Sequence, residues 1–187
     1  MSTVLPPWVS LQTARLSLSP VTIADAADVL GILSDLRTVA HNPSDGLGTL
    51  DQAAELVGRW RSQWERWGFG YWCLRTTADG GFIGYSGVKA ITFKGEEALN
   101  LVYRLAPQAW GRGLATEAAT AVVAWAVEHV PDRRLVARIR PDNLPSMRVA
   151  TKAGLHRAPT MDEEGEDGLD FIFTLPRNGF QPRPAGA

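Results

Sequence analysis

The sequence predicts a single α/β domain built on a mixed, mostly antiparallel twisted sheet of about six to seven strands flanked by helices. Short segments with alternating apolar residues indicate strands, and longer segments with apolar residues three and four positions apart indicate helices. With 187 residues, of which 45% are hydrophobic, the chain is long enough for one well-buried core and short for two. We expect residues 1–178 to form the domain and residues 179–187 to form a flexible tail.

The N-terminal part of the chain predicts a strand followed by a helix. Residues 15–19 alternate between polar and apolar side chains, as a half-buried strand does. Residues 22–35 follow as a helix that Thr22 and Asp25 can cap. The apolar residues expected on its buried side are Ile23, Ala27, Leu30 and Leu33.

A second helix and a hairpin come next. Thr49 and Gln52 form a capping-box pattern that begins a helix, and Gly68 marks its end. Its apolar face is formed by Ala53, Leu56, Val57, Trp60, Trp64 and Trp67. We assign the tryptophans of this face to core packing. Residues 71–77 and 82–92 have strand-like patterns around a short turn, which predicts a hairpin.

The most informative segment is QAWGRGLATEA, residues 108–118, which places two glycines where a helix begins. It follows a strand-like segment, residues 98–107, and precedes a helix that Pro131 closes. The first N–H groups of a helix have no intrahelical partners and carry partial positive charge, so such a turn can bind phosphate without a lysine. Gly111 and Gly113 let the backbone approach the anion closely.

The C-terminal part predicts a strand, a helix and a final hairpin. Asn143 is a good N-cap, Pro145 lies in the first turn and Gly154 follows the last one, so this helix needs no functional reason to form. Beyond it, the acidic run at residues 162–167 separates two strand-like segments. We favour a solvated hairpin loop for this run.

Together these motifs resemble the GNAT N-acyltransferases. QAWGRG fits their Q/RxxGxG/A signature, in which the turn holds the pyrophosphate of acyl-coenzyme A. The resemblance is to the branch that includes ribosomal-protein N-terminal acetyltransferases, and it covers most of residues 13–175. The matching segments are TARLSLSP (13–20), GFIGYSGV (81–88), YRLAPQAWGRGLATEA (103–118) and RIRPDNLPSMRVATKAGL (138–155). It implies a GNAT-like fold with splayed fourth and fifth strands, and transfer of an acetyl group from acetyl-CoA to a primary amine.

Two other phosphate-binding interpretations of the glycine turn fit less well. The GxxxxGK[ST] motif of nucleoside triphosphatases is absent from the chain. A dinucleotide fingerprint GxGxxG that starts at Gly111 meets Thr116 at its third glycine, and it lies in the second half of the chain. A nicotinamide-dependent oxidoreductase is therefore disfavoured.

The resemblance also implies a set of cofactor-binding residues. Val102 to Leu105 would present free backbone groups to the pantetheine arm, and the N–H of Val102 or Tyr103 would stabilise the oxyanion of the tetrahedral intermediate. Asn143 resembles the asparagine that contacts the pantetheine, and Ser146 the serine that can protonate the departing sulfur. The full predicted set is Val102, Tyr103, Arg104, Leu105, Gln108, Gly111, Arg112, Gly113, Leu114, Ala115, Thr116, Asn143 and Ser146.

The chain departs from the resembled branch at the position of its glutamate. Aligning YRLAP with the pattern EIGYxLxP places Asn100 there, and an amide is not a general base. We expect Asn100 and Ser146 to be the catalytic residues, with Asn100 positioning a water or the acceptor unless Glu96, Glu97 or a carboxylate from elsewhere takes over. An α-amine with a pKa near ~8 loses its proton at neutral pH for about 1.4 kcal/mol, whereas a lysine near ~10.4 needs about 4.6.

Asn100 thus favours an α-amine acceptor, such as a protein N-terminus, over a lysine side chain, with small-molecule amines left open. The competing class is a CoA-binding protein with weak or lost catalysis. Two segments have an alternative interpretation as acceptor contacts. They are the aromatic residues Trp64, Trp67 and Phe69, and the acidic run at residues 162–167, which could hold a cationic acceptor.

Composition limits the other partners. The net charge of −1 gives no sign of attraction to nucleic acid or to a membrane surface, and no segment approaches the ~20 apolar residues of a membrane span. The single cysteine, Cys73, excludes an intrachain disulfide, and the N-terminus lacks the pattern of a signal peptide, so we expect the cytoplasm. We expect no metal, and the oligomeric state stays open, with a homodimer the commonest arrangement.

Overall fold

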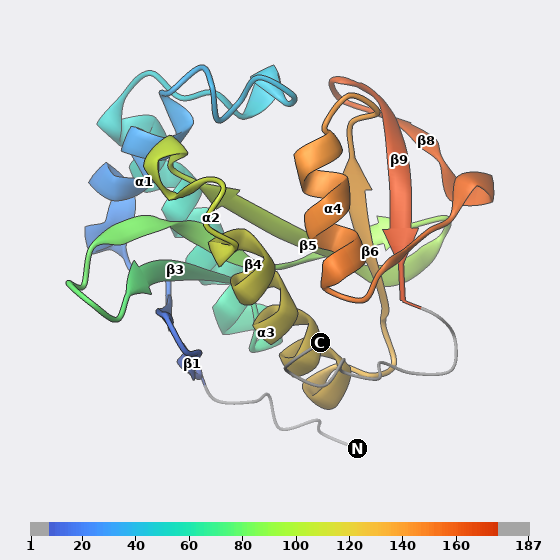
Figure 1. Ribbon diagram of the computed structural model, residues 1–187, viewed down its shortest axis with the longest axis horizontal. Helices are drawn as coiled ribbons and strands as arrows, with labels where there is room; N and C mark the ends of the chain where they lie inside the picture. The colour runs from blue at the N-terminus through green and yellow to red at the C-terminus, as the bar shows by residue number, and fades with distance from the viewer. Residues whose placement is uncertain (1–7, 176–187) are drawn as a thin grey trace.

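The computed structural model describes residues 8–175, which form one mixed sheet with helices on both faces (Figure 1). In chain order the elements are β1 (Leu11–Gln12), β2 (Leu16–Pro20), η1 (Ile23–Asp25), α1 (Ala26–Leu33), η2 (Pro43–Asp45), α2 (Leu50–Trp67), β3 (Tyr71–Thr76), β4 (Phe82–Phe93), β5 (Glu96–Leu105), η3 (Pro107–Ala109), α3 (Leu114–His129), β6 (Arg134–Ile139), α4 (Leu144–Lys152), β7 (His156–Arg157), η4 (Pro159–Met161), β8 (Glu163–Gly165) and β9 (Gly168–Thr174). The expected tail at 179–187 and both limits of the expected domain lie outside the described residues.

The sheet confirms the predicted mixed, mostly antiparallel architecture. Its strand order is β1-β2-β3-β4-β5-β6-β9-β7, with β8 paired to β9. Every pair is antiparallel except β5 and β6. The strand count exceeds the prediction because β1, β7 and β8 have only two or three residues each, too few for an alternating pattern to be recognised.

The parallel pair opens into a splay, as the resemblance implied. β5 and β6 are in register from Ala98 with Arg134 to Asn100 with Val136, and within the described chain their pairing ends there. β5 nevertheless continues to Leu105, still paired to β4 along its other edge. Its edge toward β6 is therefore left open beyond Asn100, in the gap between the two halves of the sheet in Figure 1.

Two of the predicted helix boundaries are confirmed by their caps. Thr49 accepts the N–H of Gln52 at the start of α2, and Gly68 ends this helix in a left-handed conformation with φ of 72°. At α4, Asn143 accepts the N–H of Ser146 at 3.1 Å. Side-chain caps of this kind satisfy N–H groups that the helix itself leaves free.

The predicted buried side of the first helix is wrong for two of its four residues. Ile23 and Ala27 are exposed, whereas Leu30 is half-buried against the core and Leu33 is buried as expected. The buried residues of α1 are Ala26, Val29, Ile32 and Leu33. The reason is the first turn, η1, which is a 3₁₀ helix with three residues per turn and shifts the face that a continuous α-helix would present.

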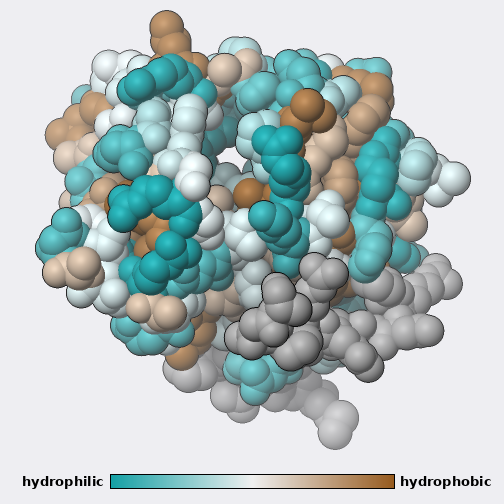
Figure 2. Space-filling model, viewed as in Figure 1, coloured by the Kyte–Doolittle hydropathy of each residue, from teal (hydrophilic) through white to brown (hydrophobic). Residues whose placement is uncertain are grey.

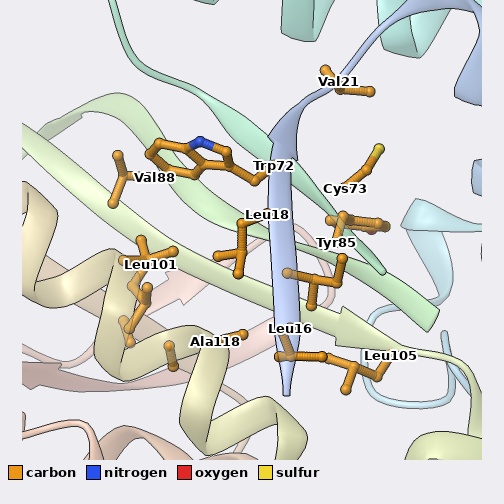
Figure 3. Packing of buried hydrophobic residues seen from close by; sticks show 14 of the residues in the cluster. Leu16, Leu18, Val21, Trp72, Cys73, Tyr85, Val88, Leu101, Leu105 and Ala118 are labelled. Atoms are coloured by element: carbon orange, nitrogen blue, oxygen red, sulfur yellow. The ribbon is translucent and has the colours of Figure 1, made fainter. Parts of the chain in front are cut away.

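The core lies between the sheet and its two layers of helices. Figure 3 shows Leu18 of β2 near Trp72 of β3, Leu16 farther along β2, and Leu101 of β5 on the side of Ala118 of α3. All five side chains are buried, each large one contributing about 1.5–3 kcal/mol relative to an exposed position. No helix among the described residues is long and apolar enough to cross a membrane.

The tryptophans of α2 belong to this core, as predicted. Trp64 is fully buried, donates its indole N–H to the carbonyl of Tyr71 at 3.0 Å and packs edge-on against Trp72. Trp67 instead packs under the guanidinium of Arg133, 4.3 Å from its ring centre.

The acidic run forms the β8–β9 hairpin, and the expectation of a solvated loop is wrong in part. Asp162 pairs with Arg157, and Glu163 lies 3.5 Å from both Lys94 and Arg138. These carboxylates therefore fasten the hairpin to its surroundings. Glu164 and Glu166 are exposed, as a solvated loop requires.

Candidate functional site

A cavity of about 860 Å³ occupies the splay between β5 and β6. It is bounded by the glycine turn before α3, by the N-terminal half of α4, by the loop after α1 and by the β8–β9 turn. Figure 2 shows the hollow near the centre of one face of the molecule. Its size is typical of small-molecule and cofactor sites, and it combines apolar walls with a few polar groups.

The glycine turn forms one end of the cavity. Gly111 and Gly113 have φ of 72° and 76°, a left-handed conformation that glycine adopts without steric cost. Gly113 is the N-cap of α3, and it provides no side chain to satisfy the first N–H groups of the helix. Leu114, Ala115 and Thr116 continue the cavity wall from this first turn. The N-terminus of α3 therefore presents free donors and a partial positive charge to the cavity.

A side-chain network from the start of the chain holds this turn. Arg15 donates from Nη1 to the carbonyl of Arg112 at 2.9 Å and from Nε to Glu117 at 2.7 Å. Thr13 donates its hydroxyl proton to the other oxygen of Glu117 at 2.6 Å. Burial alone would raise the pKa of Glu117, but these hydrogen bonds outweigh it and lower the pKa. The sequence alone does not predict this network, because its one local signal is an acidic residue in the first turn of a helix.

Opposite the turn, Tyr103 of β5 and Ser146 of α4 form a hydroxyl pair in the cavity wall. The Tyr103 hydroxyl lies 2.8 Å from the carbonyl oxygen of Ser146 and 2.9 Å from its Oγ. Burial raises the pKa of Tyr103 to about 12, so the phenol keeps its proton at neutral pH. The Asn143 side chain holds the first turn of α4 in place by accepting the backbone N–H of Ser146. The sequence analysis assigned a role to the backbone of Tyr103 and missed its hydroxyl.

Asn100 lies at the point where the two strands separate. Its Oδ1 accepts the backbone N–H of Arg138 at 3.3 Å, a contact that replaces the next rung of the β5–β6 ladder. The carboxylates considered as alternative bases are placed elsewhere. Glu96 and Glu97 are exposed at the far end of β5 outside the cavity wall, and Glu97 pairs with Arg133 at 2.8 Å.

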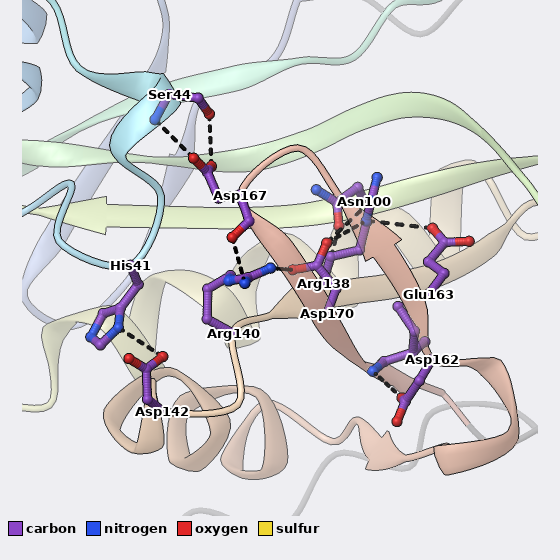
Figure 4. A network of polar contacts seen from close by, with 11 residues as sticks. His41, Ser44, Asn100, Arg138, Arg140, Asp142, Asp162, Glu163, Asp167 and Asp170 are labelled. Carbon is purple, nitrogen blue, oxygen red and sulfur yellow. Dashed lines mark hydrogen bonds and ion pairs between the residues drawn. The ribbon is translucent and has the colours of Figure 1, made fainter.

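A buried carboxylate, Asp170 of β9, lies in the cavity wall near Asn100 (Figure 4). It accepts hydrogen bonds from Arg138 Nε at 3.1 Å and from Arg140 Nη1 at 3.3 Å. Gly165 allows this packing, because a Cβ there would collide with the carboxylate. Since two guanidinium groups occupy its oxygens, we interpret Asp170 as a positioning residue for the arginines and not as a free base.

The side chain of Arg104 extends from β5 to a different wall of the cavity. Its Nη2 donates to Asp45 of η2 at 2.6 Å. Burial works to lower the pKa of Arg104, and the neighbouring Tyr85 and Asp45 offset this and raise it, so the guanidinium stays charged. Burial raises the pKa of Tyr85 to about 12, which keeps that hydroxyl neutral.

The loop after α1 bridges the cavity to the opposite wall. Asp167 in the β8–β9 turn accepts the backbone N–H of Ser44 at 3.1 Å and its hydroxyl at 2.7 Å. A second contact joins His41 Nδ1 and Asp142 Oδ1 at 3.1 Å (Figure 4). These residues are more than 100 positions apart in the sequence. The loop is therefore fixed over the cavity at two points.

Comparison with known proteins decides the family. The model of the acetyltransferase (GNAT) domain matches residues 15–156. The chain belongs to the GNAT acetyltransferase family. Among its relatives, YkkB from Bacillus subtilis (strain 168) is 30% identical over 152 residues, which cover 81% of this chain and 87% of YkkB.

Solved structures share the fold of this GNAT acetyltransferase. An acetyltransferase from Agrobacterium tumefaciens str. C58 superposes with a TM-score of 0.75 at 25% identity, over 90% of this chain and 95% of that one. RimJ from Mycobacterium smegmatis, in complex with CoA-disulfide, superposes with a TM-score of 0.71 at 19% identity, over 87% of this chain and 82% of that one. Ribosomal-protein acetyltransferases are also among the structural neighbours.

In this GNAT acetyltransferase the cavity brings together most of the residues expected from the sequence. Gln108 and Arg112 are exceptions, because they belong to the turn but do not line the cavity. The predicted residues that do line it are Asn100, Val102, Tyr103, Arg104, Leu105, Gly111, Gly113, Leu114, Ala115, Thr116, Asn143 and Ser146. The aromatic residues Trp64, Trp67 and Phe69 are absent from the wall of this cavity.

Proposed function

We propose that this GNAT acetyltransferase transfers the acetyl group of acetyl-CoA to a primary amine, with a protein N-terminal α-amine favoured, by direct attack in a ternary complex. The observation that carries the proposal is the single cavity shared by three parts. These are the open edge of β5 beyond Asn100, the glycine turn at the start of α3, and the Ser146 hydroxyl on α4.

The donor fits this cavity along its length. The pyrophosphate would lie on the N–H groups of residues 111–116, where the dipole of α3 favours negative charge. The pantetheine would pair with the open edge of Val102 to Leu105, in the manner of an added strand, and contact Asn143. The CoA-disulfide complex of RimJ, which shares the fold, supports this choice of cofactor.

The chemistry requires one bond to form, one to break and two protons to move. The neutral amine attacks the thioester carbon, and a β5 N–H at Val102 or Tyr103 stabilises the oxyanion. Collapse of the intermediate forms the amide and breaks the carbon–sulfur bond. The thiolate takes a proton from Ser146 Oγ, which is replaced through Tyr103 across their 2.9 Å contact, and solvent both returns a proton to Tyr103 and takes the proton that the amine nitrogen releases.

The acceptor preference follows from the groups near the reaction centre. Asn100 cannot remove a proton, and Asp170 is occupied by two arginines. Without a base at these two positions, deprotonation by water costs about 1.4 kcal/mol for an α-amine and about 4.6 for a lysine at neutral pH. This difference supports an α-amine.

Release of free thiol from acetyl-CoA tests the proposal. We expect release with an alanine-initiated peptide, and a much slower rate with the same peptide N-acetylated and carrying one lysine. Calorimetry should show that the protein binds CoA and does not bind NAD. Binding of NAD without CoA would refute the proposal.

A second candidate is a CoA-binding protein with weak or lost catalysis, which the amide of Asn100 favours. It predicts tight CoA binding with no thiol release above the uncatalysed rate for any amine. The same two measurements therefore distinguish the candidates.

We also propose a cytoplasmic location. Cys73, the single cysteine of the chain, is buried in β3, and burial raises the pKa of its thiol far above the usual range. Such a thiol is unreactive and needs no oxidising compartment. Fractionation of the source cells tests this location.

A further inference from the structure

We propose that Asp45 and Arg104 form the acceptor-binding pair of this enzyme, and that the pair selects an amine whose neighbouring carbon carries a carbonyl group. The inference rests on the proposed function and assigns residues to its acceptor. Asp45 would bind the amine and Arg104 the carbonyl oxygen.

Arg104 has unused hydrogen-bond donors in a buried position. Its side chain is 14% exposed, and its single side-chain hydrogen bond within residues 8–175 is the one from Nη2 to Asp45. Nη1 is buried and has no partner among these residues. An unsatisfied buried donor is costly, and a guanidinium can donate five hydrogen bonds. Because Nη1 itself is shielded from solvent, a ligand oxygen would accept from the guanidinium donors on the exposed part of the side chain, which lines the cavity.

Asp45 has the complementary property. Its Oδ2 accepts from Arg104, whereas Oδ1 has no hydrogen-bond partner within the described chain. The side chain is 53% exposed and lines the cavity. Its neighbour Ser44 is tied to Asp167 across the cavity, so the carboxylate is held in place before any ligand arrives. Such pre-organisation reduces the entropy lost on binding.

The pair stands beside the part of β5 proposed to hold the thioester. Arg104 is two residues from Val102 on the same face of the strand, and both residues line the cavity. The donor would use the backbone of these residues, which leaves the Arg104 side chain free for the acceptor. A group bound by the pair would therefore meet the thioester from the side of η2.

The two opposite charges decide the class of acceptor. A simple alkylammonium ion attracted to Asp45 would also meet the positive charge of Arg104 a few ångströms away. An α-amino carbonyl group presents a donor and an acceptor on adjacent carbons, and it matches both members of the pair. Peptide N-termini and amino-acid amides have this group, whereas a lysine side chain and polyamines do not.

Two small probes isolate this effect. Alaninamide and isopropylamine share a skeleton and differ in that a carboxamide replaces one methyl group. The quantity to measure is the ratio of their kcat/KM values, in the wild type and in each variant. Their different intrinsic basicities cancel when ratios are compared between proteins.

We expect the ratio to fall at least tenfold in Arg104→Lys, which retains the positive charge but not the fork of donors. In Asp45→Asn we expect kcat/KM to fall at least tenfold for both probes, because both carry the amine that Asp45 binds. Asp132→Asn is the matched control, because Asp132 is an exposed aspartate outside the cavity wall. The control should keep the wild-type ratio. All three variants should bind CoA within about twofold of the wild type and unfold at a similar temperature, since Asp45 is half exposed and Arg104→Lys preserves the ion pair.

The outcomes separate the two proposals. Thiol release in the wild type with an unchanged ratio in Arg104→Lys, or with unchanged kcat/KM values in Asp45→Asn, overturns the acceptor-binding pair and leaves the acetyltransferase proposal intact. No thiol release from the wild type with any amine, despite CoA binding, overturns both.

Discussion

Asn100 accepts the N–H of Arg138 at the position where β5 and β6 stop pairing. The side-chain amide of Asn100 thus accepts the N–H that the next backbone carbonyl of β5 would otherwise accept. The β5–β6 pairing ends at this point without leaving the Arg138 N–H unpaired. A strand edge left unpaired inside a protein needs a partner, and beyond Asn100 the cavity leaves this place to a ligand. The residue that lacks the chemistry of a base therefore has a structural reason to be at this position.

Replacing Asn100 with aspartate should add a base without removing this contact. An aspartate oxygen can still accept the Arg138 N–H, while the second oxygen can take a proton from the acceptor. We expect kcat/KM for an N-acetylated lysine peptide to rise at least tenfold, equivalent to about 1.4 kcal/mol. Asn100→Ala, which removes the contact and adds no base, should show no such gain. Equal rates for the aspartate variant and the wild type would contradict the role given to Asn100.

Ser146→Ala should lower kcat and leave CoA affinity unchanged. General acids typically contribute 10²–10⁴-fold, and because the neighbouring Tyr103 hydroxyl can replace part of this role we expect a loss of about 10²-fold. Single-turnover kinetics and calorimetry with CoA separate the two effects. Thr151→Ala is the control, because it also removes a hydroxyl from α4. The Thr151 hydroxyl lies outside the cavity wall and donates to the carbonyl of Met147 at 2.9 Å, so this variant should keep full activity. A Ser146 variant as fast as this control would exclude Ser146 as the proton donor.

The network at Glu117 should make stability depend on pH. Its folded pKa is lowered, so its contribution is present above the unfolded pKa of about 4.3 and is lost as the pH falls through the folded pKa. Glu117→Gln should therefore be less stable than the wild type at pH 7, and the two should converge as the pH falls below the folded pKa of Glu117. Because Arg15 is half exposed, we expect a difference of only about 1 kcal/mol, or about 2–4 °C in Tm.

Glu128→Gln provides the control for this measurement. Glu128 is an exposed glutamate of α3, the helix that carries Glu117, and it forms no ion pair within residues 8–175. Its Tm should match that of the wild type across the pH range. A Glu117 variant whose Tm difference from the wild type does not shrink as the pH is lowered from 7 through the acidic range would mean that the charge of Glu117 is not the source of the stabilisation.

The sequence was sufficient for features that a few neighbouring residues determine. The capping box at Thr49, the left-handed Gly68 and the N-cap at Asn143 depend on residues within one helical turn. The glycine turn belongs to the same class, because Gly111 and Gly113 adopt the conformation that other residues avoid. Of these residues, Gly111, Gly113 and Asn143 line the cavity, whereas Thr49 and Gly68 lie outside its wall.

Contacts between distant segments were beyond the reach of the sequence. Arg15 and Glu117 are 102 residues apart, and Asp45 and Arg104 are 59 apart. Each of these side chains, taken alone, has the pattern of an ordinary exposed charge, and only the fold brings the partners together. Asp170 was missed for the same reason, since its burial depends on arginines from the neighbouring strand.

Gly113→Ala should weaken CoA binding, because it acts on the turn that we propose for the pyrophosphate. An alanine held at φ of 76° costs about 1–2 kcal/mol, which the turn can relieve only by rotating its N–H groups away from the cavity. We expect CoA affinity to fall about tenfold, measured by calorimetry, together with a lower Tm. Gly58→Ala in the middle of α2, where nothing lies within 4 Å of the added methyl, should bind CoA normally and gain about 0.5–1 kcal/mol in stability. Normal CoA binding in both variants would show that the conformation of Gly113 is not required for the cofactor.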